Sequence, residues 1–336
     1  MPVKAVVVGA GGISDAWFPP LLEERVGIPA VVDLRIDAAR DQIVKYRLDA
    51  EASTDLTAAL RRTKPDFVLD LTVPEAHREV TCTALQAGCH VIGEKPMASS
   101  MDEAREMVRV AEQTGRLYMV SQSRRWWPHH EAVRRALSSG VIGCITAANC
   151  DFYIGAHFGG FRDEMPSPLI LDMAIHHFDL ARFMSGANPV AVYATEFNPK
   201  GSWYKGDVAT SCVFEMIDGV IFTYRGSWCS EGFHTSWNGD WRFIGDKGTL
   251  IYAQDQDPKA EAVAGDTGFN RPLRVVEVPV PDMEATTMHG GLREMLRFVH
   301  TGETPQTECH DNIKSLAMCF AAIESSRRGC RIPVIA

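Results

Sequence analysis

The sequence predicts an α/β protein: a doubly wound parallel sheet in the first third of the chain, then an α/β domain with a large, mostly antiparallel sheet. Three observations support this prediction. The chain has 336 residues, more than a single hydrophobic core usually spans. Short apolar runs alternate with helical stretches over the first third, which is typical of a parallel sheet covered by helices. After Arg125, longer strand-like runs separated by turns take over.

The first domain is predicted from apolar runs that alternate with helical patterns. Glycines stand where two of the helices should stop, at Gly88 and Gly115. The predicted strands are Ala5–Val8, Ala30–Asp33, Phe67–Leu71, His90–Gly93 and Leu117–Ser121. The predicted helices between them are Ile13–Arg25, Ala38–Tyr46, Leu56–Arg62, Glu75–Ala87 and Asp102–Thr114.

The second domain is predicted to be richer in hairpins, because the turn-prone pairs Asp218-Gly219 and Lys247-Gly248 separate strand-like runs. We place the domains at 1–123 and 124–336, and the C-terminal helices can pack back on the first domain. The predicted strands are Ile145–Tyr153, Val190–Phe197, Ala209–Met216, Val220–Ser227, Trp241–Ile244 and Thr249–Tyr252. The predicted helices are Glu131–Ser139, Leu171–Met184, Gly291–His300 and Ile313–Arg327.

Composition argues against several classes of partner. The formal net charge of -9 opposes a nucleic-acid partner, since such proteins usually present a basic face to the phosphates. Nine cysteines without a Cys-x-x-Cys pair indicate reduced thiols rather than a disulfide or zinc framework. No apolar run approaches the ~18 residues that would span a bilayer, and no leader precedes the first strand. We therefore expect a cytoplasmic protein with neither membrane nor nucleic-acid partners.

A glycine turn joins the first predicted strand to the first predicted helix. It reads Gly9-Ala10-Gly11-Gly12-Ile13-Ser14. Gly9 permits a tight turn and Gly11 lets the backbone approach a pyrophosphate, whose charge the amides near Gly12 and Ile13 can meet. Ser14 replaces the third glycine of the usual pattern but is small enough for close packing. The context predicts a Rossmann domain that binds a dinucleotide.

The choice between NAD and NADP depends on the end of the second predicted strand. Asp33 lies 22 residues after Gly11, where an acid can bind the hydroxyls of the adenosine ribose. A carboxylate there repels the 2′-phosphate of NADP, so NAD is preferred. Arg35 offers that phosphate a partner, so NADP stays possible.

Two further segments indicate chemistry as well as binding. Thr72-Val73-Pro74 and Glu94-Lys95-Pro96 follow predicted strands of the parallel sheet, at the edge where such sheets bind ligands. On the predicted helix Leu171–Met184, Asp172, His176 and Asp179 fall within a narrow arc. His176 can accept a hydroxyl proton, Asp172 can orient it, and Lys95 can lower the pKa of the alcohol.

Other residues are weaker candidates. The glycine-rich loop Gly155–Asp163 precedes the predicted catalytic helix, so His157 and Arg162 are candidate substrate contacts. His77 and Arg125 are candidate site residues as well. His176, His177, His157 and Asp172 do not show the spacing of a zinc site, and we expect no metal.

The chain resembles the Gfo/Idh/MocA oxidoreductases, the family of glucose-fructose oxidoreductase and inositol dehydrogenases. The resemblance rests on five segments that appear in the family's order: Gly9–Ser14, Thr72–His77, Glu94–Pro96, Asp172-x-x-x-His176-x-x-Asp179 and Gly245–Thr249.

The resemblance implies a Rossmann domain followed by an α/β domain whose open sheet binds substrate on one face and a neighbouring subunit on the other. A homodimer or homotetramer is therefore expected. The resemblance also implies a sugar or polyol substrate and the catalytic set Lys95, Asp172 and His176. Gln122 stands where the family often has asparagine, so its contact with the cofactor departs from the pattern. The implied cofactor residues include Thr72, Val73, Pro74, His77, Glu94, Lys95 and Gln122; Lys95, Arg125, His157, Arg162, Asp172 and His176 are assigned to the substrate.

Three functions remain open at this point. The first is an NAD(P)-dependent dehydrogenase that oxidises a secondary alcohol of a sugar, inositol or related polyol. The second is an NAD-dependent glycosidase, in which transient oxidation at C3 permits elimination of the glycosidic substituent. The third is a regulator that binds a dinucleotide without catalysis, although Lys95 and His176 are both present.

Overall fold

The computed structural model describes residues 2–336, which form two compact units. Unit 1 comprises residues 2–126 and Ala285–Ile313, and unit 2 comprises Trp127–Glu284 and Lys314–Ala336. Along the sequence, the chain therefore returns to unit 1 after it has passed through most of unit 2. The predicted domain bounds, 1–123 and 124–336, stay a prediction, because compact units in one chain do not define independently folding domains.

Unit 1 contains a six-stranded sheet in the order β3-β2-β1-β4-β5-β6, and every neighbouring pair is parallel. This order confirms the predicted doubly wound fold, and it reverses direction between β1 and β4, the position where such sheets bind ligands. The strands are β1 (Lys4–Val8), β2 (Gly27–Val32), β3 (Glu51–Ser53), β4 (Phe67–Asp70), β5 (His90–Gly93) and β6 (Tyr118–Val120).

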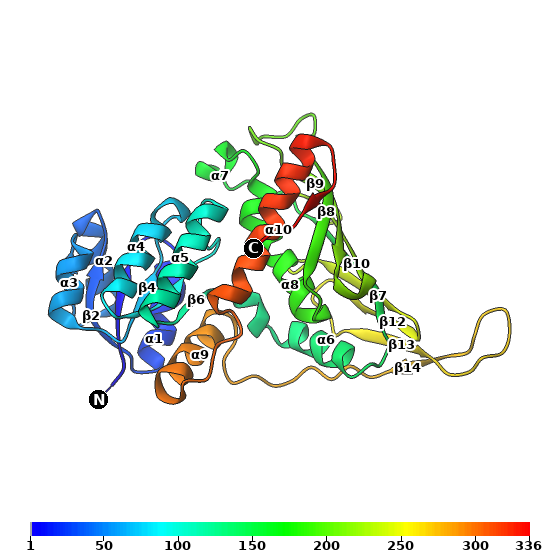
Figure 1. Cartoon of the computed structure of the whole chain (residues 1–336), viewed down its shortest axis with the longest axis horizontal. Coiled ribbons are helices and arrows are strands. Elements are labelled where there is room, and N and C mark those ends of the chain that lie inside the picture. Colours follow the sequence, from blue (N-terminus) through cyan, green and yellow to red (C-terminus); the bar gives the residue numbers. More distant parts are fainter. Residues whose placement is uncertain (1) are drawn as a thin grey trace. The chain divides into compact units, whose positions relative to one another are not determined.

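Five helices connect successive strands of this sheet: α1 (Ser14–Glu23), α2 (Ile36–Tyr46), α3 (Leu56–Thr63), α4 (Pro74–Gln86) and α5 (Met101–Thr114). Figure 1 shows α2 to α5 beside the strands. Unit 1 also contains the 3₁₀ turn η1 (Ser123–Trp126) after β6 and the helix α9 (Thr287–Thr301). Strand β3 was not predicted, because it has only three residues, Glu-Ala-Ser, at the edge of the sheet. So short and polar a segment lacks the apolar pattern of a buried strand.

Unit 2 contains a nine-stranded sheet in the order β14-β13-β12-β11-β7-β10-β9-β8-β15. Only β7 and β10 run parallel among the described pairs of this sheet, so the prediction of a mostly antiparallel sheet is confirmed. The strands are β7 (Ile145–Tyr153), β8 (Pro189–Phe197), β9 (Ala209–Met216), β10 (Ile221–Ser227), β11 (Asp240–Gly245), β12 (Gly248–Tyr252), β13 (Lys259–Val263), β14 (Leu273–Val276) and β15 (Ile332–Pro333).

Helices cover one face of this sheet, and α8 and α10 lie against it in Figure 1. The buried face is strongly aromatic, with Phe178 of α8 packing edge-on against Phe214 and Tyr224. The helical segments are α6 (Pro128–Ser138), α7 (Phe161–Glu164), η2 (Leu169–Ala174), α8 (Ile175–Ser185), η3 (Ile217–Gly219) and α10 (Cys309–Arg328), which begins in unit 1 and continues in unit 2.

The predicted helix Leu171–Met184 differs from the observed one at its start. Its first part, η2 (Leu169–Ala174), is a π-helix, and α8 continues from Ile175. A π-helix bonds i to i+5 and widens the turn, which no apolar periodicity indicates, and such segments occur often at functional sites. Four residues still make nearly one turn in either geometry, so Asp172 and His176 stay on one side of the helix.

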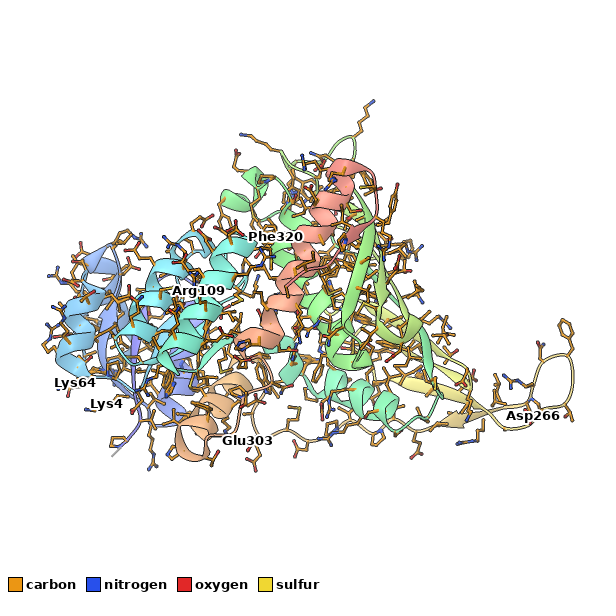
Figure 2. All side chains as sticks on the ribbon, in the orientation of Figure 1. Lys4, Lys64, Arg109, Asp266, Glu303 and Phe320 are labelled. Atoms are coloured by element: carbon orange, nitrogen blue, oxygen red, sulfur yellow. The ribbon has the colours of Figure 1, made fainter. Side chains whose placement is uncertain are left out.

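The strands β13 and β14 were also not predicted. Their sequences mix charged and apolar residues, and β14 is an exposed edge strand. The connection between them extends from the sheet of unit 2, and the side chains around Asp266 project from it in Figure 2. Such a segment packs on little of the core, so neither length nor periodicity marks it in the sequence.

One buried carboxyl group in unit 2 makes stability depend on pH. Burial raises the pKa of Glu196 on β8 to about 8, and the charge of Asp207 acts in the same direction. Ser167 Oγ donates to its Oε2 at 3.2 Å. The folded protein therefore holds this proton at pH values where the unfolded chain has lost it. Glu196 stabilises the fold fully below about pH 4.5, and that contribution is lost as the pH rises toward 8.

We expect Glu196→Gln to remove this loss. The free energy of unfolding of the variant, relative to the wild type, should rise between pH 5 and pH 8 with a slope of at most about 1.4 kcal/mol per pH unit. Urea unfolding at several pH values measures the slope. The exposed Glu261→Gln is the matched control and should follow the wild type. Parallel curves for Glu196→Gln and the wild type would show that this carboxyl does not titrate as expected.

Candidate active site

The glycine turn of unit 1 lies between β1 and α1, where the strand order reverses. Gly9 has φ +95°, and a Cβ on it would stand 2.7 Å from the carbonyl carbon and oxygen of Leu71. Only glycine fits this approach of the turn to the end of β4. A Cβ on Gly11 or Gly12 would meet no atom within 4 Å, so their backbone borders open space. The turn thus has the form of a cradle for a phosphate group.

Ser14 occupies the position of the third glycine without disturbing the turn. Its buried hydroxyl donates to the carbonyl oxygen of Gly11 at 2.6 Å. The preceding residue, Ile13, forms the cap of α1 and is partly exposed. The substitution at Ser14 therefore adds a hydrogen bond inside the turn.

Asp33 follows β2 and binds two backbone amides. Its Oδ2 accepts from Ala10 N–H and its Oδ1 from Arg35 N–H, both at 2.8 Å. The guanidinium of Arg35 lies 3.9 Å from the carboxylate and is largely exposed. Asp33 therefore connects the glycine turn to the end of β2, and its remaining lone pairs are available to ligand hydroxyls.

A pocket of about 690 Å³ lies beside these groups in unit 1. Its volume is within the range of small-molecule sites. The glycine turn, the end of β2 and the end of β4 all contribute to its wall. The lining includes Gly9, Gly11, Asp33, Leu34, Arg35, Thr72, Val73, Ala76 and Val80.

A buried polar network holds the loop after β4. Asp70 accepts hydrogen bonds from Thr72 Oγ1 at 2.6 Å and Thr81 Oγ1 at 3.2 Å, and its Oδ2 lies 3.0 Å from His77 Nδ1. Burial acts to lower the pKa of His77, but the carboxylates of Asp70, Glu94 and Glu75 outweigh it and raise the pKa. The network thus fixes Thr72, which lines the pocket together with Val73, whereas His77 is buried.

Asp70 was missed in the sequence. A single acid inside the otherwise apolar run Phe67–Leu71 is the signal that would have found it, since a buried carboxylate needs hydrogen-bond partners.

Glu94 and Lys95 follow β5, with a cis peptide bond between Lys95 and Pro96. Glu94 accepts from the indole N–H of Trp17 at 2.8 Å, and burial raises the pKa of its carboxyl group. Trp17 is the second residue that sequence reasoning missed, because an aromatic residue in a helix reads as core. Lys95 is half-buried at the carboxyl end of the strand.

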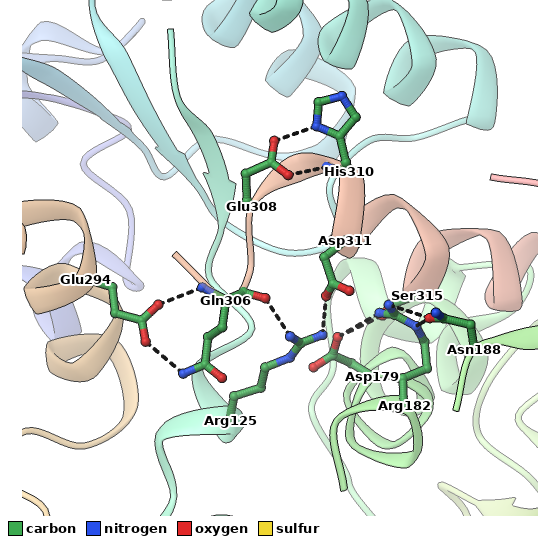
Figure 3. A network of polar contacts seen from close by, with 10 residues as sticks. All are labelled: Arg125, Asp179, Arg182, Asn188, Glu294, Gln306, Glu308, His310, Asp311 and Ser315. Carbon is green, nitrogen blue, oxygen red and sulfur yellow. Dashed lines mark hydrogen bonds and ion pairs between the residues drawn. The ribbon is translucent and has the colours of Figure 1, made fainter. Parts of the chain in front are cut away.

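Gln122 and Arg125 lie at the end of the sheet beyond β6. Both polar atoms of the Gln122 amide are buried and have no hydrogen-bond partner among residues 2–336, which fits an amide that contacts a ligand or water. Arg125 is buried, donates to the carbonyl oxygen of Gln306 and pairs with Asp311, both at 2.6 Å (Figure 3). These two contacts are consistent with a structural role for Arg125 as well as with the predicted substrate contact.

In unit 2, the π-helix η2 presents Asp172 to Arg162. The Nε of Arg162 donates to Asp172 Oδ2 at 2.5 Å. His176 lies in the first turn of α8 and is nearly buried, while His177 is fully buried against Phe152 and Tyr224. The structure thus separates His177, packed in the aromatic core, from His176, which keeps a small exposed fraction at the start of α8.

Asp179, predicted to share a helix face with Asp172 and His176, has buried polar partners in unit 2. Its carboxylate accepts from Ser315 Oγ at 2.7 Å and lies 3.7 Å from Arg182, which also donates to Asn188 (Figure 3). All these groups are buried or half-buried. Asp179 therefore holds α8 against α10 within unit 2.

His157 lies on the exposed side of the glycine-rich loop. Its ring stacks on Trp203 at 3.7 Å between centroids, and its Nε2 lies 2.8 Å from Glu231 Oε1. Elsewhere in the described chain, Glu308, Cys309 and His310 form the group whose ligand atoms come close enough for a metal, within 4.8 Å. These three hydrogen-bond to one another and are not the histidines considered in the sequence.

Comparison with known proteins settles the family. Residues 3–122 match the model described as an oxidoreductase family with an NAD-binding Rossmann fold, and residues 130–251 match the GFO/IDH/MocA C-terminal domain. The chain belongs to the Gfo/Idh/MocA oxidoreductase family. The predicted family, fold, oxidoreductase class and NAD-binding domain are thereby confirmed.

Relatives in the Gfo/Idh/MocA family include named sugar dehydrogenases. D-glucoside 3-dehydrogenase of Escherichia coli is 30% identical over 69% of this chain and 70% of its own. D-apiose dehydrogenase of Paraburkholderia graminis is 28% identical over 97% of this chain and 88% of its own. Inositol 2-dehydrogenase of Rhizobium meliloti is 27% identical, with 77% and 78% covered.

Solved structures support the same Gfo/Idh/MocA fold. An oxidoreductase from Agrobacterium radiobacter, in complex with NAD+, L-tartaric acid and magnesium, has a TM-score of 0.88 at 21% identity and 99% coverage of both chains. No helix among residues 2–336 has the length and apolar character needed to cross a membrane.

Proposed function

We propose that this Gfo/Idh/MocA oxidoreductase oxidises a secondary alcohol of a sugar, inositol or related polyol. The observation that carries the proposal is the π-helix η2, which presents Asp172 and leads directly into His176. π-helical segments are rare and concentrate at functional sites. The names of the relatives add support, since three of them are dehydrogenases of D-apiose, D-glucosides and inositol.

In this proposal His176, Asp172 and Lys95 each have a role in removing the proton of the substrate hydroxyl. His176 accepts the hydroxyl proton at an imidazole nitrogen as the carbinol carbon loses its hydride. Asp172, whose carboxylate is paired with Arg162, stabilises the resulting imidazolium. Lys95 lowers the pKa of the alcohol by its positive charge. NAD, when bound, supplies the hydride acceptor.

We assign the cofactor to unit 1 residues that fit it. The open backbone at Gly11 and Gly12 suits a pyrophosphate, and the buried amide of Gln122 has donors and acceptors to offer. The neighbouring Ile13, Thr72, Val73, Pro74, His77, Glu94 and Lys95 complete the proposed set. Among the proposed substrate contacts, His157 and Arg162 are exposed enough to reach a ligand, and Arg125 stays a prediction.

NAD is the proposed cofactor, and Asp33 is the residue that favours it over NADP. We expect Asp33→Asn to lower the ratio of kcat/KM with NAD to that with NADP by about 10-fold, because the neutral amide no longer repels a 2′-phosphate. Initial rates with both cofactors measure the ratio. The exposed Asp37→Asn is the matched control and should keep the wild-type ratio. An unchanged ratio for Asp33→Asn would remove Asp33 from cofactor selection.

We also propose a homo-oligomer that forms through the uncovered face of the nine-stranded sheet. On that face Tyr193, Val213 and Ile251 are 52%, 43% and 36% exposed. Tyr193 is paired with Val213, and the same row continues over Thr223, Asn149 and Arg242 to Ile251. Exposed apolar residues in one row of an open sheet are typical of a subunit contact.

Val213→Arg tests this face. A charge at the apolar end of the row, beside Tyr193, should reduce the oligomer to the mass of one chain, as measured by size-exclusion chromatography with light scattering. Val44→Arg on α2 of unit 1, at a position that is 75% exposed and lies outside this sheet, should leave the mass unchanged. A wild type that already has the mass of one chain, or a Val213→Arg variant that keeps the oligomer, would contradict the proposal.

One screen tests the reaction itself. Sugars, inositols and glycosides are incubated with NAD or NADP while NADH absorbance and product identity are followed. Net NADH formation with an oxidised sugar supports the proposal. Cleavage of a glycoside without accumulation of NADH would replace it with a redox-neutral glycosidase, and tight binding of NAD without turnover of any compound would leave a binding protein.

A further inference from the structure

Three aromatic side chains gather on the surface of unit 2 around Arg162. Phe158, Phe161 and Trp237 are 43%, 66% and 45% exposed. We call these three residues the aromatic patch. The guanidinium carbon of Arg162 lies 5.0 Å from the ring centre of Phe158 and 4.7 Å from that of Phe161. The rings of Phe158 and Trp237 are 6.1 Å apart. Exposed apolar side chains grouped in this way mark binding surfaces.

Arg162 connects the aromatic patch to the proposed catalytic residues. Its Nε donates to Asp172, and its side chain is 32% exposed. The two Nη atoms make no hydrogen bond to any of residues 2–336, so up to four N–H donors remain for a ligand. A group bound on the patch would therefore lie within reach of the same arginine that holds Asp172.

The backbone holds the patch in a defined geometry. Gly160, which precedes Phe161, has φ +71° and ψ −145°, a conformation open essentially to glycine alone. Phe158 packs edge-on against the buried Trp228 at 5.1 Å, and Trp237 packs on the buried Phe152 at 6.1 Å. Two of the three exposed rings thus rest on the core, so little conformational entropy is lost when a ligand covers them.

We propose that the aromatic patch and Arg162 form a second subsite, which binds the group attached to the sugar ring that is oxidised. The substrate class is then a glycoside, with an aglycone or a second sugar, rather than a free monosaccharide. This inference rests on the proposed function. Aromatic faces bind the apolar faces of pyranose rings and of aromatic aglycones, while guanidinium N–H groups donate to hydroxyls. A free monosaccharide has a single ring, and if that ring were bound at Asp172 and His176 the aromatic patch would stay exposed to water.

The test compares matched substrates. Four aldohexoses, each as the free sugar, the methyl glycoside and the phenyl glycoside, are assayed with NAD and the wild-type enzyme. We expect kcat/KM for the best phenyl glycoside to exceed that of its free sugar by about 10- to 100-fold. In Phe158→Ala and Phe161→Ala this advantage should fall to within about threefold, with kcat/KM for the free sugar unchanged. Phe269→Ala, fully exposed in the β13–β14 connection, is the matched control and should keep the wild-type ratio.

Several results would overturn the subsite and leave the proposed function intact. One is a wild type that oxidises free sugars as well as their glycosides. Another is a loss in Phe158→Ala that is equal for free sugar and glycoside. A third is a change of oligomeric mass in Phe158→Ala, which would identify the patch as a subunit contact. Failure of the proposed function looks different, because the wild type would then form no NADH from any of the twelve compounds nor from the inositols of the wider screen.

Discussion

His176→Ala should lower kcat/KM for alcohol oxidation by about a thousand-fold while NAD affinity stays within twofold of the wild type. The alcohol must lose its proton as hydride leaves, and a positioned base contributes 10²- to 10⁴-fold to such a step. The imidazole of His176 is the base in the proposed mechanism, and alanine leaves no acceptor in its place. NAD affinity is measured by fluorescence titration and kcat/KM by initial rates.

The activity of His176→Ala could fall because the site is disturbed or because the base is missing, and the experiment has to separate these two causes. Added imidazole should restore part of the activity of His176→Ala, because a small base can enter the space that the side chain has vacated. His300→Ala is the matched control, since this exposed histidine bonds only the carbonyl oxygen of Leu296 and should retain full activity. Activity of His176→Ala at the wild-type level would remove His176 from the mechanism.

Gly9→Ala should lose stability, whereas Gly11→Ala should lose NAD affinity and keep its stability. At Gly9 a methyl group would collide with the backbone of Leu71, and φ +95° is unfavourable for alanine. We expect Gly9→Ala to lose about 2–4 kcal/mol of unfolding free energy. At Gly11 the methyl group meets no atom within 4 Å, so stability should change by less than about 0.5 kcal/mol.

The NAD affinities complete this comparison. The Kd of Gly11→Ala should rise at least about 10-fold, because the methyl group enters the space that a pyrophosphate needs. Urea unfolding without cofactor and titration with NAD separate the two effects. Wild-type NAD affinity in Gly11→Ala would show that the pyrophosphate does not approach the backbone at this residue.

The sequence predicted the parts of the fold that depend on local patterns. Each strand of unit 1 with four or more residues has a buried apolar run, and the glycine turn is visible because its residues need special backbone geometry. Three strands carry no such apolar run: the short polar strand β3, the strand β13, in which charged residues alternate with buried alanines, and the exposed edge strand β14. Their positions depend on pairing with neighbouring strands, and the sequence of a single segment does not show which strands it pairs with.

The candidate site was predictable by residue type more than by contact. Asp172 and His176 stood out by their spacing, yet the π-helix that carries Asp172 and the ion pair with Arg162 come from tertiary packing. Asp179 shows the limit of helix periodicity. The spacing predicts that it shares a helix face with His176, but it could not indicate the hydrogen bond from Ser315, 136 residues later in the chain.

The division of the chain into units has a consequence for recombination. The polypeptide crosses from one unit to the other three times, after Trp126, after Glu284 and after Ile313, and the last crossing falls inside α10. A single crossover between genes therefore cannot exchange one unit whole, because Arg125 would be parted from its partners Gln306 and Asp311. Chimaeras that transfer a new specificity should tolerate changes inside the central segment, Trp127–Glu284, far better than a replacement of everything beyond Trp126.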